Sequence, residues 1–196
     1  MNIIRNRLSL IFIVIFVCLL TSCTGLSLAT SGARAVYNRH ELQQQLSDHY
    51  ITMQAYNRIY DDSGRFDDTN LSITTLNNEV LLTGEVTSQQ QLNAIVSIVK
   101  KIPNISEIHC HIRVSGKSSA LTRVSDSWIT AKVKSKFLAS NDLDVSRIKV
   151  VTENGTVYLM GIVFPDEAPI AVEIAQNTLG VQDVVKYFSY MRISKT

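Results

Sequence analysis

Cysteine and tryptophan are scarce in this chain of 196 residues, which has three cysteines and one tryptophan, Trp128. It also has almost no net charge, with 19 basic and 17 acidic residues. Arg5 and Arg7 account for the difference, so the chain beyond residue 22 has 17 residues of each sign. Binding a nucleic acid backbone requires a concentrated excess of positive charge, so a nucleic acid partner is not expected.

A hydrophobic run long enough to span a membrane is missing as well. The apolar stretch from Leu8 to Leu20 has 13 residues, whereas a spanning helix needs about 20. It follows two arginines and ends in Leu20-Thr21-Ser22-Cys23, the order of parts in a secretory signal peptide. This ending resembles the lipobox of bacterial lipoproteins, which implies that residues 1–22 are removed and that Cys23 carries acyl chains. Residues 23–39 are then predicted to be a tether.

The residues around the lipobox also bear on location and redox chemistry. The residue after Cys23 is Thr24, whereas an aspartate at this position would resemble an inner-membrane retention signal. We therefore expect the protein to lie on the periplasmic face of the outer membrane. Cys18 leaves with the signal and Cys23 is acylated, which leaves Cys110 without an intramolecular disulfide partner. Ile108 and Ile112 flank Cys110 at period two, which predicts a cysteine buried in a strand.

The remaining chain contains one pattern twice. Residues 71–86 and 148–163 align without a gap, and each has two alternating segments around a turn, Asn77-Asn78 or Asn154-Gly155. These turns predict β-hairpins, because a tight hairpin turn requires positive φ at both central residues. A helical pattern lies before and after each hairpin, and a third strand follows. Each repeat is therefore predicted to be helix, strand, strand, helix, strand, in the α+β class.

The helix before each hairpin is predicted from apolar residues at helical spacing, and those of the second repeat would face the core. In the second repeat the stripe is Ile129, Val133 and Phe137, on a helix capped by Ser125 or Asp126. In the first repeat the predicted stripe is Leu42, Leu46, Tyr50, Met53, Tyr56 and Tyr60.

The second repeat contains Val150-x-Thr152-x-Asn154-Gly155-x-Val157-x-Leu159-x-Gly161-x-Val163, with Gly180-Val181-x-x-Val184 downstream. This string and the order of elements resemble the BON domain, and two copies after a lipobox resemble the dual-BON outer-membrane lipoproteins. The resemblance implies tandem BON domains at 40–114 and 125–196, joined by a linker at 115–124, each with a three-stranded mixed sheet packed on two helices. It also implies anionic phospholipid binding through the first helix of the second domain, support of outer-membrane integrity and accumulation at division sites.

Trp128 is the residue that makes this helix a candidate for membrane binding. It lies about 140° from the centre of the predicted core stripe, so we expect it to face outward. Lys132 and Lys136 follow at i+4 and i+8, and the small residues Ala131 and Ser135 allow close approach to a surface. An indole beside ammonium groups suits an anionic lipid interface, which predicts phospholipid binding by these five residues. Alternatively, Trp128 packs against the linker or the first domain, and the lysines form a solvated face.

The second hairpin is apolar on both faces, whereas the first is polar on its outward face. Tyr158, Met160 and Tyr187 are therefore candidates for a contact with the other domain or with an envelope protein, and burial under the linker is a further explanation. A protein-interaction adaptor for envelope assembly or cell-wall remodelling is accordingly the alternative function.

Residues arranged for catalysis are missing from the sequence. It contains no serine elbow, no phosphate-binding glycine loop and no general-base constellation. We therefore expect no enzyme activity, no small-molecule substrate and no cofactor. His109 and His111 share a strand face, but no carboxylate or cysteine is expected beside them, so no metal site is predicted, and a metal or redox protein is the least supported class.

Overall fold

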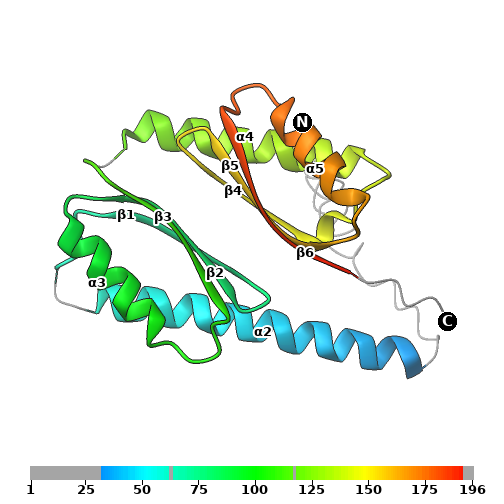
Figure 1. Cartoon of the computed structure of the whole chain (residues 1–196), viewed down its shortest axis with the longest axis horizontal. Helices are drawn as coiled ribbons and strands as arrows, with labels where there is room; N and C mark the ends of the chain where they lie inside the picture. The colour runs from blue at the N-terminus through cyan, green and yellow to red at the C-terminus, as the bar shows by residue number, and fades with distance from the viewer. Residues whose placement is uncertain (1–31, 62–63, 117, 192–196) are drawn as a thin grey trace, which may run out of the picture. The chain divides into compact units, whose positions relative to one another are not determined.

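A computed structural model describes residues 32–61, 64–116 and 118–191 (Figure 1). The predicted signal segment, Cys23 and most of the predicted tether lie outside the described residues. Both repeats belong to one compact unit that comprises residues 41–196. Within the described ranges, no helix combines the length and the apolar character needed to cross a membrane.

The first repeat is a three-stranded mixed sheet with helices on one face (Figure 1). Strand β2 lies in the centre, antiparallel to β1 and parallel to β3. A parallel pair needs a long crossover connection, and α3 provides it. The elements are α2 (Gly32–Tyr60), β1 (Asn70–Leu76), β2 (Glu79–Val86), α3 (Gln89–Lys100) and β3 (Glu107–Val114).

The second repeat has the same order and the same sheet topology, with β5 central, antiparallel to β4 and parallel to β6. The α+β class and the duplicated helix, strand, strand, helix, strand order are thereby confirmed. A short 3-10 helix, η1 (Val145–Arg147), precedes its first strand. The other elements are α4 (Ala120–Ala139), β4 (Ile148–Glu153), β5 (Thr156–Val163), α5 (Glu167–Gln176) and β6 (Asp183–Tyr190).

An aspartate from the first helix of each repeat holds the hairpin turn. The turn residues have φ between 47° and 75°, the left-handed region that the asparagines and glycine predict. The buried Asp48 carboxylate accepts both backbone N–H groups of Asn77-Asn78 at 2.8 and 2.9 Å. Asp126 does the same for Asn154-Gly155, at 2.9 Å for each bond. This clamp fixes how each helix lies on its sheet.

The predicted start of the second-repeat helix is wrong. The helix α4 begins at Ala120, inside the segment predicted as a linker, and its N-cap is Ser119 in place of Ser125 or Asp126. The Ser119 hydroxyl accepts the N–H of Thr122 at 3.1 Å, which satisfies a free donor of the first turn. Asp126 serves the hairpin turn instead.

The apolar residues that predict α2 are mostly not its core residues. Its core residues are Ile51, Ala55 and Ile59, each at most 1% exposed. Of the six predicted residues only Tyr56 packs against the core, and its hydroxyl accepts the N–H of Ile73 at 3.0 Å. The helix has apolar residues on two opposite sides, and the Asp48 clamp, which shares the side of Ile51, Ala55 and Ile59, decides which side faces the sheet.

Cys110 is exposed and unpaired within the described part of the chain, contrary to the predicted burial. It lies on β3, which is an edge strand of its sheet. Its partner in the register, Leu82 on the central strand, is 1% exposed. The helices thus cover the centre of this face and leave Cys110 at the margin in contact with solvent.

Candidate functional site

The helix α4 has a largely apolar outer face opposite its core face. Its buried residues Asp126, Ile129, Val133 and Phe137 face the sheet, and positions about half a turn away must then face outward. The outward positions follow the spacing i, i+3, i+7, and every residue there is exposed. We call this set the α4 outer stripe: Leu121, Val124, Trp128, Ala131, Ser135 and Leu138.

The apolar members of the α4 outer stripe are unusually open to solvent. The exposed fractions are 81% for Leu121, 67% for Val124, 63% for Trp128 and 72% for Leu138. Isolated exposed apolar side chains are common on protein surfaces, but Leu121, Val124 and Trp128 are neighbours on one helix face and form a band that Ala131 extends toward Leu138. Such a band is typical of a surface that binds a partner or a membrane.

Basic side chains lie on both sides of the α4 outer stripe. Lys132 places its Nζ atom 5.3 Å from the centre of the Trp128 ring, within the range of a cation–π contact. Lys136 lies one turn further on the same side and donates to the Asn177 carbonyl at 2.8 Å. Arg123 and Lys134 lie on the opposite side and are exposed. The stripe is therefore an apolar band edged by four cations.

The five predicted lipid-binding residues lie together on this surface. Trp128, Ala131 and Ser135 belong to the stripe, and Lys132 and Lys136 edge it. Sequence reasoning missed Leu121 and Val124 because it began the helix too late, and it missed Leu138 because the pattern was not followed beyond Lys136. The spacing i, i+3, i+7 from Leu121 onward was the signal that could have identified them.

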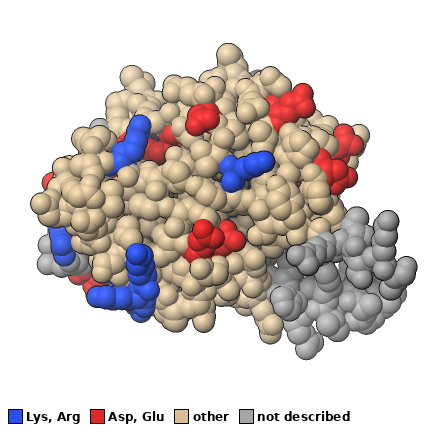
Figure 2. Space-filling model, viewed as in Figure 1, with Lys and Arg blue, Asp and Glu red and all other residues tan. Residues whose placement is uncertain are grey.

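Positive charge does not dominate the face of the molecule that Figure 2 draws. On the face drawn in Figure 2, blue basic and red acidic side chains alternate, and neither sign covers a large area. Attraction to an anionic surface would therefore depend on local arrangements such as the edges of the α4 outer stripe, because dispersed exposed charges of both signs largely cancel beyond about 10 Å in salt.

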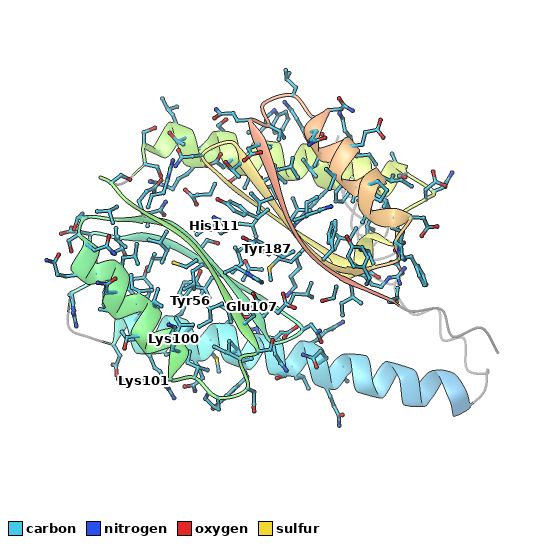
Figure 3. All side chains as sticks on the ribbon, in the orientation of Figure 1. Tyr56, Lys100, Lys101, Glu107, His111 and Tyr187 are labelled. Carbon is cyan, nitrogen blue, oxygen red and sulfur yellow. The ribbon has the colours of Figure 1, made fainter. Side chains whose placement is uncertain are left out.

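Tyr158, Met160 and Tyr187, the predicted contact residues, lie against the first repeat. Tyr158 and Met160 are 7% and 1% exposed and form one buried cluster with Leu81 of β2. The Tyr187 ring stacks on His109 at 3.8 Å between centroids, and its hydroxyl is hydrogen-bonded to His111, as the labels in Figure 3 help to locate. This arrangement matches the domain-contact alternative, and none of the three presents a large exposed surface to another protein.

Polar groups from both repeats surround the Glu85 carboxylate, which is 1% exposed. Arg113 donates to it at 2.9 Å and Asn154 of the second repeat at 2.6 Å. Burial raises the pKa of this carboxyl, but hydrogen bonds from Asn70, Asn154 and Ser118 outweigh burial and lower the pKa of Glu85 overall.

Glu153 lies beside this network without comparable support. Its Oε1 atom is buried and has no hydrogen-bond partner among the residues that the structure describes. Burial, together with the nearby Glu85 and Asp126 carboxylates, raises the pKa of Glu153 to about 7. One carboxyl at this contact therefore titrates near neutral pH.

Two carboxylates do lie beside His109, contrary to the expectation from sequence. The parallel register of β2 and β3 sets Glu79 opposite Glu107, and their side chains approach the two ring nitrogens of His109 at 3.1 Å (Nε2) and 3.7 Å (Nδ1). The three residues could offer ligand atoms to a metal ion. However, each carboxylate approaches a different ring nitrogen, whereas one ion binds only one of them, so the arrangement fits a hydrogen-bonded histidine better.

Comparison with known proteins gives a family match and several relatives. The family model described as BON domain matches residues 47–116 and 125–192. The chain is 30% identical over 149 residues to the 21 kDa hemolysin of Actinobacillus pleuropneumoniae, and the match covers 76% of each chain. It is 29% identical over 147 residues to the outer membrane lipoprotein DolP of Haemophilus influenzae, covering 75% of this chain and 76% of that one. It is 25% identical over 158 residues to the osmotically-inducible protein Y of Escherichia coli, covering 79% and 78%.

Proposed function

This chain belongs to the BON domain family, and from that premise we propose that it is an outer-membrane lipoprotein whose α4 outer stripe binds anionic phospholipid and so supports membrane integrity. In this proposal Cys23 is acylated and holds the protein on the periplasmic face of the outer membrane. A relative that matches three quarters of the chain is named an outer membrane lipoprotein, and the lipobox-like residues before Cys23 support the same anchoring.

The observation that carries the lipid-binding proposal is the exposure of Trp128 within an apolar band edged by cations. Its indole is 63% exposed, although burying an aromatic side chain of this size normally stabilises a fold. Indole rings favour the headgroup region of a bilayer, and lysine side chains beside them can pair with lipid phosphate. The α4 outer stripe combines both features on one helix face.

Acylation and the α4 outer stripe have different tasks in this account. Two or more acyl chains hold a protein at the membrane almost permanently, because each buried methylene contributes about 0.8 kcal/mol. The stripe contributes less: about 1 kcal/mol for each lysine near an anionic leaflet, in addition to its apolar contact. It therefore selects the headgroup and orients the second repeat on the membrane.

The proposal is tested with the full mature chain in which Cys23→Ala removes the acylation site. Flotation with vesicles of phosphatidylcholine alone, and with 30 mol% phosphatidylglycerol added, measures binding without the anchor. We expect binding to the anionic vesicles only, and loss of that binding in Trp128→Glu with an unchanged melting temperature. Equal binding to both kinds of vesicle, or unchanged binding by Trp128→Glu, contradicts the proposal.

A pair of double variants separates the charge at this site from charge in general. Lys132→Gln with Lys136→Gln removes two cations from the edge of the stripe, and Lys100→Gln with Lys101→Gln removes two exposed cations from the first repeat (labelled in Figure 3). We expect about a 30-fold weaker vesicle affinity for the first pair, equivalent to about 1 kcal/mol for each lysine. The second pair is the matched control and should change the affinity by less than about threefold.

A further inference from the structure

The helix α2 also has an apolar outer face, and nothing in the described part of the molecule covers it. It lies about 180° from the core residues Ile51, Ala55 and Ile59. Its apolar side chains are about half exposed, which is unusual for residues of this size on one helix. We call this set the α2 outer stripe: Leu42 at 55%, Leu46 at 60%, Tyr50 at 48%, Met53 at 44% and Tyr60 at 45%.

The spacing of the α2 outer stripe is that of a coiled coil. From Leu46 the outward positions advance by four, three, four and three residues, through Tyr50, Met53 and Asn57 to Tyr60. This is the alternation of d and a positions in a heptad repeat. Asn57 occupies one a position and is exposed, and a single asparagine at such a position fixes register between paired helices. The pattern therefore favours a second helix of matching register as the partner.

Charge argues against an anionic membrane as the partner of α2. Among its exposed residues from Leu42 to Tyr60, the one side chain that is always charged is Arg58, and the flanking positions carry glutamines and His49. The α4 outer stripe, by contrast, is edged by four cations. A face with so little charge does not repel a second copy of itself, and it gains little from anionic headgroups.

Acylation of Cys23, which is part of the proposed function, would set the orientation of such a pair. This part of the inference therefore rests on the proposed function. The helix α2 begins at Gly32, nine residues after Cys23, and nine residues reach at most about 30 Å. Two copies anchored in one leaflet therefore hold both helix starts near the membrane, with the same polarity. Helices held in this way meet in parallel and in register.

We propose that the α2 outer stripe is a self-association face, on which α2 helices of two anchored copies pair in parallel with Asn57 opposite Asn57. The pattern from Leu46 to Tyr60 covers about two heptads, fewer than the three to four that usually indicate a stable coiled coil. Pairing is therefore weak between free chains. On a membrane the anchor confines both copies, which raises the effective concentration, by analogy with a short tether, to about the millimolar range.

Cysteine cross-linking on vesicles tests this proposal. The mature chain carries Cys23→Ser, Cys110→Ser and an N-terminal hexahistidine tag, and binds vesicles that contain nickel-chelating lipid, so the test needs no acylation. In this background we introduce one cysteine at a time, by Leu46→Cys, Met53→Cys or Tyr60→Cys, and oxidise each variant separately. In a parallel, in-register pair each position meets its own copy, so all three should give disulfide-linked dimers.

The control position is Gln45, which is exposed and lies about 100° from the centre of the stripe. We expect Gln45→Cys to form at least fivefold less dimer than Met53→Cys at equal surface density. Cross-linking of Met53→Cys alone would indicate an antiparallel pair and overturn the proposed orientation. Equal cross-linking at Gln45 and Met53, or no dimer at any stripe position, would overturn the proposal itself.

A further variant distinguishes this inference from lipid binding by α4. Leu46→Glu with Met53→Glu, read out through Tyr60→Cys, should abolish dimer formation and leave binding to phosphatidylglycerol vesicles unchanged. Trp128→Glu should have the reverse effects. Because the substituted side chains are exposed, the melting temperature of each variant should stay within about 2 °C of the parent, which reports that the fold is intact.

Discussion

The helices α2 and α4 occupy the same place in the two repeats and differ on the side that faces outward. On the inner side both carry a buried aspartate that accepts two N–H groups of its hairpin turn, Asp48 or Asp126. On the outer side both have an apolar stripe, but four cations edge the stripe of α4, whereas Arg58 is the corresponding charge on α2. The duplication thus keeps the features that hold the fold and varies the outer faces, for which we propose different partners.

Removing the buried aspartate that both helices share should have the largest effect. Asp48→Ala or Asp126→Ala leaves two N–H groups of a tight turn without their charged acceptor. We expect each to lower the free energy of unfolding by about 3 kcal/mol, measured by urea denaturation. Asparagine at either position keeps one acceptor oxygen and should lower the free energy of unfolding clearly less. If one alanine substitution lowers it much less than the other, the two clamps are not equivalent.

Adding cations to α2 should have the next largest effect, because it removes the main difference between the outer faces of the two helices. Gln45→Lys with His49→Lys in a Trp128→Glu background edges the α2 outer stripe with two lysines. At about 1 kcal/mol for each lysine, vesicles with phosphatidylglycerol should bind about 30-fold more tightly than the Trp128→Glu parent. No gain in flotation would mean that charge is not the feature that distinguishes the two helices.

The contact between the repeats gives a pH dependence of intermediate size. Glu153 has an ordinary pKa of 4.5 and a folded-state pKa of about 7, so between these pH values the folded protein retains a proton that the unfolded chain releases. Stability due to this group is therefore lost as the pH rises from about 4.5 to 7. Glu153→Gln removes this charge and should raise the free energy of unfolding at pH 8. The gain should be only about 1 kcal/mol, because partial exposure to solvent reduces the electrostatic penalty.

Thermal unfolding at several pH values provides the control for this prediction. At pH 4.5 and below, Glu153 is largely protonated in the folded state, and the glutamine variant should unfold at nearly the same temperature as the parent. A stabilisation of equal size at pH 4.5 and pH 8 would show that the effect comes from packing and not from ionisation.

The smallest effect is expected at a position on the third strand that is exposed in both repeats. Cys110 on β3 and Lys186 on β6 occupy equivalent positions beside the buried Leu82 and Leu159, and both are exposed. Cys110→Lys should therefore change the free energy of unfolding by less than about 0.5 kcal/mol. A larger loss would indicate that Cys110 is packed, as its apolar flanks had predicted.

The sequence predicted the elements whose signals are local. Asn77-Asn78 and Asn154-Gly155 identified both hairpins because positive φ strongly restricts the residue type, and the outward placement of Trp128 followed from the helical period. The start of α4 was predicted wrongly, and the inner face of α2 was not identified from the sequence. Both depend on which polar side chain reaches which backbone group: Ser119 caps α4, and Asp48 orients α2 through a turn about 30 residues away.

The candidate site was predicted in part for the same reason. Trp128, Lys132 and Lys136 are close in sequence, and their common surface could be derived from one helix. The approach of Glu79 and Glu107 to His109 depends on the parallel register of two strands that are not adjacent in sequence. The burial of Tyr158 and Met160 depends on how two sheets meet, which no local pattern specifies.

The depth of Trp128 in a bilayer reports whether the α4 outer stripe binds anionic lipid. The mature chain with Cys23→Ala is mixed with vesicles of phosphatidylcholine, with or without 30 mol% phosphatidylglycerol, that contain lipids brominated near the headgroup or near the end of the acyl chain. We predict a blue-shifted emission, quenched more by the shallow bromines, with the anionic vesicles only. An unshifted and unquenched emission with anionic vesicles would contradict the account.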